Sequence, residues 1–339
     1  MLISFEEAIA QSHAEGKRPH VLLGNGFSRA CRNDIFAYDA LFERADFRTL
    51  SPTAREVFEV LDTVDFEEVM RGLDTAAKLV ELYAPGQAEL VDRLRQDSLG
   101  LREVLVKAIA ESHPDLPSAI PRERYAACRR FLSKFDKIFT LNYDLLLYWA
   151  LMQVDLEPEV PCDDGFRTPE DPAPYVTWEP ENIYNQNVYY LHGALHLFDS
   201  GTEVQKYTWI NTGIPLIEQI REALGNGLYP LFVAEGTSKA KLRKIRHSAY
   251  LARAERALMS IGGTLFVYGH SLSENDDHIY RAILSSKVTR LWISIYGNPE
   301  SEDNRRKIQR AINLTQRRPH KKKPLEVGFF SAESARVWG

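Results

Sequence analysis

Residues 20–28 read HVLLGNGFS, an apolar run that ends in a glycine-rich segment. Its apolar run predicts a short buried strand, and its two glycines predict a tight turn that leads into a helix. Strand, glycine-rich turn and helix open a nucleotide-binding βα unit, in which Gly24 and Gly26 let backbone amides approach a phosphate. Ser28 can cap the helix or bind a phosphate oxygen. The alternative is an ordinary tight turn, because Arg29 stands where the dinucleotide-binding fingerprint requires a third glycine.

The next segment, residues 38–135, has a different character. Apolar residues recur there at helical spacing and strand patterns are absent, which predicts several helices in a row. We therefore expect a helical insertion over residues 38–135. The surrounding α/β domain would then comprise residues 1–37 and 136–339.

Strand patterns return after residue 136 and alternate with helical patterns. This alternation predicts an α/β fold with a Rossmann-like, doubly wound parallel sheet. The segment 163–180 is rich in proline and acidic residues and is expected to form a loop. Further strands are expected at residues 137–141, 188–191, 230–234, 264–268, 291–295 and 325–330, and helices at 145–152, 238–260, 276–284 and 303–315.

Unusual polar residues follow four of the expected strands, in the motifs GNGFS (24–28), TLNYD (140–144), LHG (191–193) and GHSL (269–272). Ligands of open α/β sheets bind at the carboxyl ends of the strands, so these motifs are expected to converge on one site. Asn142 and Asp144 alternate and could face one pocket, with local turn capping as the alternative. His192 could act as a base on a hydroxyl, or it could simply close its strand.

In this order along the chain, the four motifs resemble those of the sirtuin superfamily. The resemblance implies that the glycine motif wraps the phosphates of NAD and that the GHSL loop holds its adenosine half. It also implies that Asn142, Asp144 and His192 are the catalytic residues, the last as part of a catalytic histidine–glycine pair. The residues that the resemblance assigns to NAD binding are Gly24, Asn25, Gly26, Phe27, Ser28, Thr140, Gly269 and Ser271.

Two departures separate the chain from the protein deacylases of this superfamily. Its three cysteines, Cys31, Cys128 and Cys162, form no C-x-x-C pair, so the chain cannot build a four-cysteine zinc module. The helical block is also foreign to the deacylases. Bacterial sirtuin-like effectors share both departures, and the chain is similar to that branch, including an uncharacterised bacterial family with the same motifs. Such effectors are mostly NAD hydrolases of anti-phage defence, often paired with a sensor or ATPase protein.

The resemblance thus implies an NAD+ glycohydrolase that yields nicotinamide and ADP-ribose. Asn142 would seat the ribose and the attacking water, and Asp144 would hold the nicotinamide carboxamide. His192 would bind a ribose hydroxyl and serve as general base. NAD would be the substrate, and no metal is needed. The alternatives are a non-catalytic module that senses NAD or a related nucleotide for a larger complex, and, with less support, a protein deacylase.

The net charge and hydropathy of the chain argue against nucleic-acid binding and membrane insertion. The net charge of -5 gives no reason to expect a surface that wraps nucleic acid. No apolar run reaches the roughly 20 residues that span a bilayer, and the first residues lack the basic start of a signal peptide. We therefore expect a cytoplasmic protein that neither enters a membrane nor binds nucleic acid directly. A homo-oligomer is expected as well.

Overall fold

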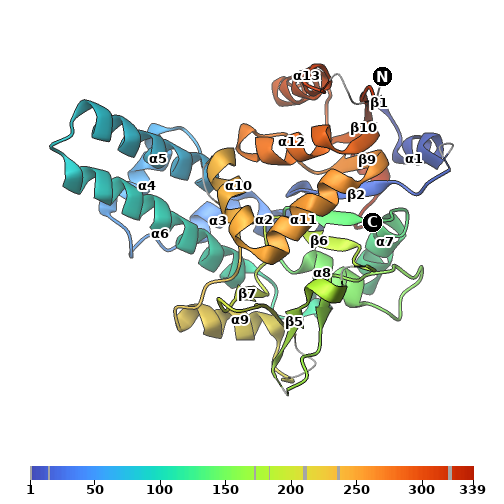
Figure 1. Cartoon of the computed structure of the whole chain (residues 1–339), viewed down its shortest axis with the longest axis horizontal. Helices are drawn as coiled ribbons and strands as arrows, with labels where there is room; N and C mark the ends of the chain where they lie inside the picture. The colour runs from blue at the N-terminus through green and yellow to red at the C-terminus, as the bar shows by residue number, and fades with distance from the viewer. Residues whose placement is uncertain are drawn as a thin grey trace.

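The computed structural model describes residues 2–13, 16–171, 173–182, 184–208, 212–234, 237–319 and 323–339. A seven-stranded sheet, in the order β1-β11-β10-β9-β2-β3-β6, forms its centre (Figure 1). All of its neighbouring strands run parallel, which confirms the Rossmann-like α/β fold. Its strands are β1 (Leu2–Ile3), β2 (His20–Leu23), β3 (Ile138–Thr140), β6 (Val188–Tyr190), β9 (Gly262–Tyr268), β10 (Lys287–Ile295) and β11 (Glu326–Ser331).

Helices cover both faces of this sheet. Every residue of β2, β3 and β6 is buried, as expected for parallel strands with two covered faces. In β2, Val21 and Leu23 share one core with helices α1 (Phe5–His13) and α7 (Arg122–Leu132). Leu22 points the other way, into a second core with α11 (Ala249–Ser260), α12 (Asp277–Ser285) and α13 (Glu302–Gln316).

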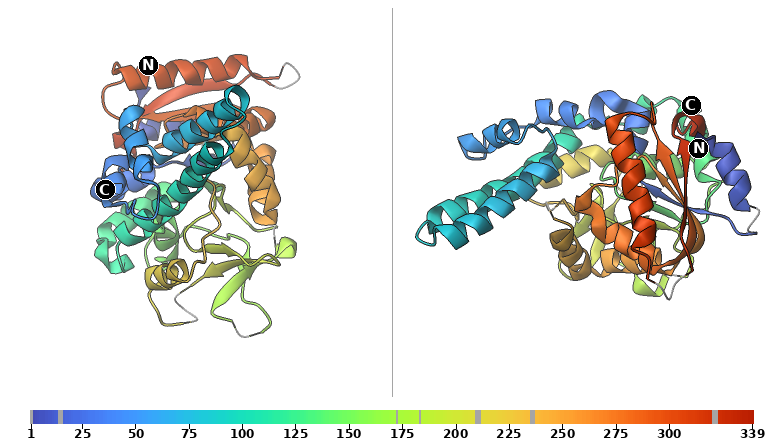
Figure 2. Two further views of the ribbon diagram at one scale, coloured as in Figure 1. Left: turned by 90° about the vertical axis from the view of Figure 1, so that its left-hand side faces the viewer. Right: turned by 90° about the horizontal axis from the view of Figure 1, so that it is seen from above.

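Every regular element between β2 and β3 is helical, as the spacing predicts. Helices α5 and α6 pack along each other and extend away from the sheet as a hairpin (Figures 1 and 2). Asp65 caps the start of α5, where its side chain accepts a hydrogen bond from the Glu67 amide at 2.9 Å. The helices are α2 (Gly26–Phe36), α3 (Tyr38–Arg44), α4 (Pro52–Val60), α5 (Phe66–Tyr83), α6 (Ala88–Ser112), η1 (Pro117–Ala119) and α7.

The structure also contains a second sheet, which is antiparallel and which the sequence analysis did not predict. It has the order β4-β5-β8-β7, and β4 and β5 lie in the segment that was expected to be a loop. That expectation is wrong because TyrValThrTrp, the β-favouring run of β5, pairs across long separations with β4 and β8. The strands are β4 (Phe166–Arg167), β5 (Tyr175–Trp178), β7 (Leu197–Asp199) and β8 (Val204–Tyr207).

Two further expectations are wrong. Residues 230–234 form no strand, because their backbone pairs with the loop after β6 through one isolated bridge between Phe232 and Gly193. The expected helix at 238–260 is two helices, α10 (Ser238–His247) and α11, because Ser248 is extended and its side chain caps α11. The remaining helices are α8 (Leu146–Met152), α9 (Leu216–Gly225), η2 (Pro180–Asn182), η3 (Glu274–Asp276) and η4 (Glu333–Ala335). Among the helices described, none is long and apolar enough to cross a membrane.

Candidate functional site

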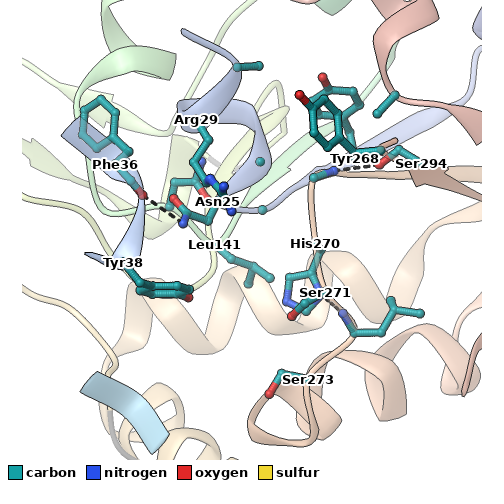
Figure 3. A pocket seen from close by; sticks show the side chains of 18 of the residues that line it. Asn25, Arg29, Phe36, Tyr38, Leu141, Tyr268, His270, Ser271, Ser273 and Ser294 are labelled. Atoms are coloured by element: carbon teal, nitrogen blue, oxygen red, sulfur yellow. Dashed lines mark hydrogen bonds between the residues drawn. The ribbon is translucent and has the colours of Figure 1, made fainter. Parts of the chain in front are cut away.

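A cavity of about 1170 Å³ lies at the carboxyl ends of the central strands (Figure 3). Its walls come from the loops after β2, β3, β6, β9, β10 and β11, from the start of α5 and from α13. The sequence-predicted site residues that line it are Gly24, Asn25, Gly26, Asn142, Asp144, His192, Gly269 and Ser271. The expected convergence of the four motifs on one sheet edge is therefore present.

The other three predicted residues lie behind the cavity wall. Phe27, Ser28 and Thr140 are each at most 1% exposed. The Thr140 hydroxyl accepts a hydrogen bond from the Asn142 amide at 3.0 Å, and the Phe27 carbonyl accepts one from Trp338 Nε1 at 2.9 Å. These residues hold the cavity wall in place, whereas the motif resemblance in the sequence analysis implied that they bind NAD directly.

Two glycine loops meet at the centre of the cavity. The Gly26 amide donates to the Gly269 carbonyl at 2.7 Å, and a Cβ on Gly26 would lie 2.5 Å from the Gly269 Cα. Gly269 also has a φ of +68°, a conformation that side-chain-bearing residues rarely adopt. Glycine is therefore required at both positions of this close approach, which we call the glycine contact. Beside it, Asn25 Nδ2 donates to the Phe36 carbonyl at 3.1 Å (Figure 3).

A three-residue hydrogen-bond cluster joins the glycine loop to the end of β3. The Ser28 hydroxyl donates to Asp144 Oδ2 at 2.5 Å, and Asn142 Nδ2 donates to the Ser28 oxygen at 2.8 Å. Asp144 Oδ1 accepts from the Leu146 amide at 2.9 Å and so caps the turn that leads into α8. Burial raises the pKa of Asp144 above its ordinary value, against the opposing effect of the Ser28 hydrogen bond. Asp144 thus both lines the cavity and caps a local turn, so the two interpretations of this motif are compatible.

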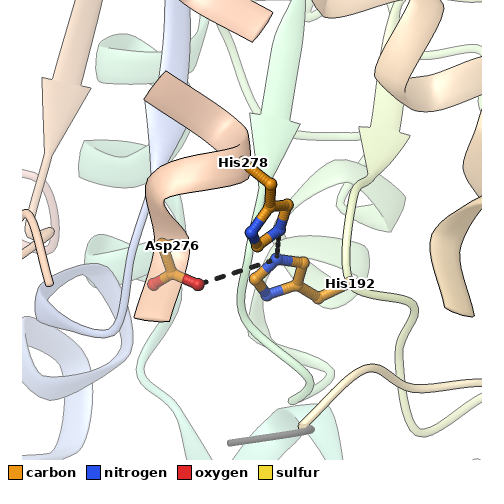
Figure 4. A group of neighbouring side chains, drawn as sticks. All are labelled: His192, Asp276 and His278. Carbon is orange, nitrogen blue, oxygen red and sulfur yellow. Dashed lines mark hydrogen bonds and ion pairs between the residues drawn. The ribbon is translucent and has the colours of Figure 1, made fainter. Parts of the chain in front are cut away.

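His192 lies at the floor of the cavity and faces a second histidine (Figure 4). Its Nε2 is 2.9 Å from the Nε2 of His278 and 3.9 Å from Asp276 Oδ1. Burial lowers the pKa of His192 well below its ordinary value, so the ring is neutral near pH 7. A hydrogen bond between two neutral rings requires one Nε2 to donate and the other to accept.

Three charged residues that the sequence analysis did not single out lie beside this pair. The Lys241 ammonium is fully buried, 2.5 Å from Glu67 Oε2 and 3.0 Å from Asp276 Oδ1. We call Glu67, Lys241 and Asp276 the buried charge cluster. They come from α5, α10 and η3, and Glu67 and Lys241 are 174 positions apart. The one sequence signal available was weak, since Asp276 lies four residues after the GHSL loop and precedes a helix.

The buried charge cluster carries two carboxyl groups and one ammonium group. Burial raises the pKa of Glu67 to about 7, although Lys241 opposes this shift. Burial would also raise the pKa of Asp276, but Lys241 and the His270 hydrogen bond at 2.9 Å hold it well below its ordinary value. When Glu67 is ionised, the cluster is net negative, and it lies against the floor of the cavity.

His192, Asp276 and His278 together offer three ligand atoms within 4.8 Å of one another (Figure 4). Two imidazoles and a carboxylate can hold a divalent metal ion. The oxygen of Asp276 nearest to His192 is also the one that binds the Lys241 ammonium. A metal ion there would lie close to a buried positive charge, so the residues fit a hydrogen-bonded network better than a metal centre.

The comparisons with known proteins give one family. Residues 21–338 match the family model described as a domain of unknown function, DUF4917. A search of curated proteins finds no match. The matched region contains the glycine contact, the hydrogen-bond cluster of Ser28, Asn142 and Asp144, and the buried charge cluster. The family model therefore covers the whole candidate site.

Proposed function

The chain belongs to the DUF4917 family, and we propose that it cleaves NAD+ at the nicotinamide–ribose bond to release nicotinamide and ADP-ribose. The observation that carries this proposal is one continuous cavity lined by the glycine contact, by Asn142 and by His192. Phosphate-binding glycine loops and polar strand ends in one cavity are what a dinucleotide requires.

The order of strands gives the dinucleotide a direction. The pyrophosphate would lie over the glycine contact, between β2 and β9. Asn142 and His192 follow β3 and β6, on one side of β2. The nicotinamide riboside half therefore extends toward them, and the adenosine half extends toward β9 and β10.

The reaction breaks the bond between the ribose C1′ and the nicotinamide nitrogen, and the electron pair leaves with nicotinamide. The ribose then carries oxocarbenium character, which the buried charge cluster favours when Glu67 is ionised and the cluster is net negative. Asn142 Nδ2 donates one amide proton to Ser28 Oγ, so its Oδ1 is oriented to accept from a ribose hydroxyl or from water. Water bonds to C1′ and gives up one proton to a base.

His192 is the base in this proposal. Its Nε2 contacts His278, and its Nδ1 has no hydrogen-bond partner among the described residues. The neutral ring accepts a proton at that nitrogen in the tautomer whose Nε2 carries the ring hydrogen and donates to His278 Nε2. Asp144 acts through Ser28 and Asn142 as a positioning residue, because its Oδ2 accepts from the Ser28 hydroxyl that in turn accepts from Asn142 Nδ2. This role replaces the direct hold on the carboxamide expected from the sequence.

The test is nicotinamide release from NAD+ by the purified protein. Asn142→Ala and His192→Ala should each lower turnover by about a hundredfold or more, because each removes a group that acts in the transition state. Asn313→Ala is the matched control, since Asn313 is exposed on α13. Full turnover in a folded Asn142→Ala protein would contradict the mechanism. NAD+ binding without cleavage by the wild-type protein would favour the non-catalytic sensing module.

We further propose that this activity serves anti-phage defence by depleting cytoplasmic NAD+, in a homo-oligomer and with a sensor or ATPase partner. The motif resemblance to bacterial sirtuin-like effectors supports this proposal. Cells that carry the wild-type gene and its neighbours should lose NAD+ on infection, and cells with Asn142→Ala should not. Equal NAD+ levels in the two strains during infection would contradict the defence role.

A further inference from the structure

Lys307 extends from α13 toward the cavity without a carboxylate partner. Its Nζ donates to the Ser294 carbonyl at 2.8 Å. It makes no ion pair within the described ranges, although Asp303 lies four residues earlier on the same helix. Burial lowers the pKa of Lys307 to about 8. A cation held partly out of water with only a carbonyl as partner is suited to receive an anion.

The position of Ser294 places this lysine near the dinucleotide path. Ser294 is the second-to-last residue of strand β10, and its hydroxyl accepts from the Gly269 amide at 2.9 Å (Figure 3). Lys307 is thus linked to the glycine contact through one residue. It lies on the β9–β10 side of β2, opposite to the side of Asn142 and His192.

A second cation lines the same cavity next to β10. Arg336 follows η4, and no carboxylate in the part of the chain that the structure describes forms an ion pair with it. The Ala332 amide donates to the Ile295 carbonyl at 2.8 Å, which holds this segment against the end of β10. The nearby Glu333 carboxylate is occupied, since it accepts from the Gly297 amide and the Ser331 hydroxyl at 2.6 and 2.9 Å.

Parallel strands lie about 4.8 Å apart, so β10 is roughly 10 Å from β2, within reach of the adenosine half of a dinucleotide bound at the glycine contact. In Rossmann-like sites a free carboxylate near the adenosine ribose accepts its 2′-hydroxyl, whereas a cation accommodates a 2′-phosphate. We infer that Lys307, supported by Arg336, forms a subsite for the 2′-phosphate, so that the preferred substrate is NADP+. This inference rests on the proposed function for its substrate, but its ligand chemistry can be tested separately.

The probes are 2′,5′-ADP and 5′-AMP, which differ only in the 2′-phosphate, with binding measured by titration calorimetry. The wild-type protein should bind 2′,5′-ADP about tenfold more tightly or better, because a charge-assisted contact is gained. Lys307→Met should bring this affinity ratio close to one, and Lys307→Arg should retain most of it. Lys287→Met is the control, since Lys287 is exposed at the opposite end of β10, and it should keep the wild-type ratio.

Equal affinities of the two probes for the wild-type protein would overturn the inference, and so would an unchanged ratio in Lys307→Met. If Lys307→Met does not fold, Arg336→Gln provides the second variant, and its ratio should fall as well. Nicotinamide release from NAD+ and from NADP+ separates the two proposals. A retained binding ratio without release from either dinucleotide would refute the glycohydrolase but keep the subsite. Release of nicotinamide from NAD+ and NADP+ at equal rates, with equal affinities for the two probes, would support the glycohydrolase and refute the subsite.

Discussion

The Ser28 hydroxyl lies 2.5 Å from Oδ2 of Asp144, although the two residues are 116 positions apart. The same hydroxyl oxygen accepts from Asn142 Nδ2 at 2.8 Å. Ser28 is fully buried, so it reaches no solvent. The hydroxyl therefore couples the glycine loop to the two polar residues after β3 and sets which way the Asn142 amide points.

Ser28→Ala should lower the turnover of NAD+ and not only its binding. The substitution removes the acceptor that orients Asn142 and leaves the buried Asp144 with one hydrogen bond fewer. Losing one partner of a buried polar group costs about 1–3 kcal/mol of unfolding free energy. Nicotinamide release at saturating NAD+ and urea denaturation measure the two effects. A raised KM with unchanged kcat would show that Ser28 acts only on binding, and Ser260→Ala on the surface of α11 is the control.

The buried charge cluster should be a strong determinant of stability. Lys241→Met removes the ammonium that lies between Glu67 and Asp276 and leaves two buried carboxyl groups uncompensated. Breaking a buried pair on one side costs about 3–5 kcal/mol. The unfolding free energy from urea denaturation should fall by that amount. Adding Glu67→Gln to Lys241→Met should restore part of the loss, and additive losses in the double variant would contradict the pairing.

Local sequence patterns predicted the parallel sheet and much of the cavity wall. Short apolar runs followed by glycine or polar residues are signals within a few positions, and they located β2, β3 and β6 and placed Asn142 and His192 at one edge. The sequence analysis placed Ser28 correctly at the start of a helix after the glycine turn, but it did not predict the direction of the Ser28 side chain. It is the third residue of α2, and the helical rotation turns its side chain inward, away from the cavity.

The parts that the sequence did not predict depend on distant contacts. The antiparallel sheet arises from pairings such as Tyr175 with Tyr207, which no local alternation specifies. Lys241 looked like one cation of a basic helix, and its role becomes visible only when α5 brings Glu67 to it. Such charges carry no motif, because their chemistry depends on burial and on a partner from another element.

The purified protein should contain no stoichiometric metal, zinc included. The chain has no C-x-x-C pair, and the Lys241 ammonium lies 3.0 Å from the carboxylate of the His192–Asp276–His278 group. Elemental analysis of protein purified without chelator measures the content. One zinc or other divalent ion per chain, lost in His278→Ala, would overturn both this prediction and the assignment of His192 as a free base.

Acid should destabilise the fold in a window set by buried histidines. His113 is 2% exposed, and burial lowers its pKa to about 4. Its Nε2 accepts from the Leu145 amide at 3.1 Å, so the proton of the neutral ring is on Nδ1, which faces the Pro114 carbonyl at 3.0 Å. Protonation would remove the acceptor beside the Asp144 loop. Burial also lowers the pKa of His20 and of His278 to about 4, which acts in the same direction.

The sign follows from proton uptake. An unfolded histidine binds a proton below pH of about 6.5, whereas buried His113 does not until about pH 4, so unfolding takes up protons between these values. The contribution of each such histidine to the unfolding free energy should be constant above that window and fall by about 1.4 kcal/mol per pH unit as the pH is lowered through it, whereas Glu67, whose pKa burial raises to about 7, contributes with the opposite sign. His113→Gln keeps an acceptor for the Leu145 amide and should reduce the slope of unfolding free energy against pH by about one proton.

The measurement is urea denaturation at several pH values between 7 and 4.5. His247→Gln, exposed at the end of α10, should leave the slope unchanged. An identical slope in His113→Gln and the wild-type protein would show that His113 is protonated in the folded state as readily as in the unfolded chain.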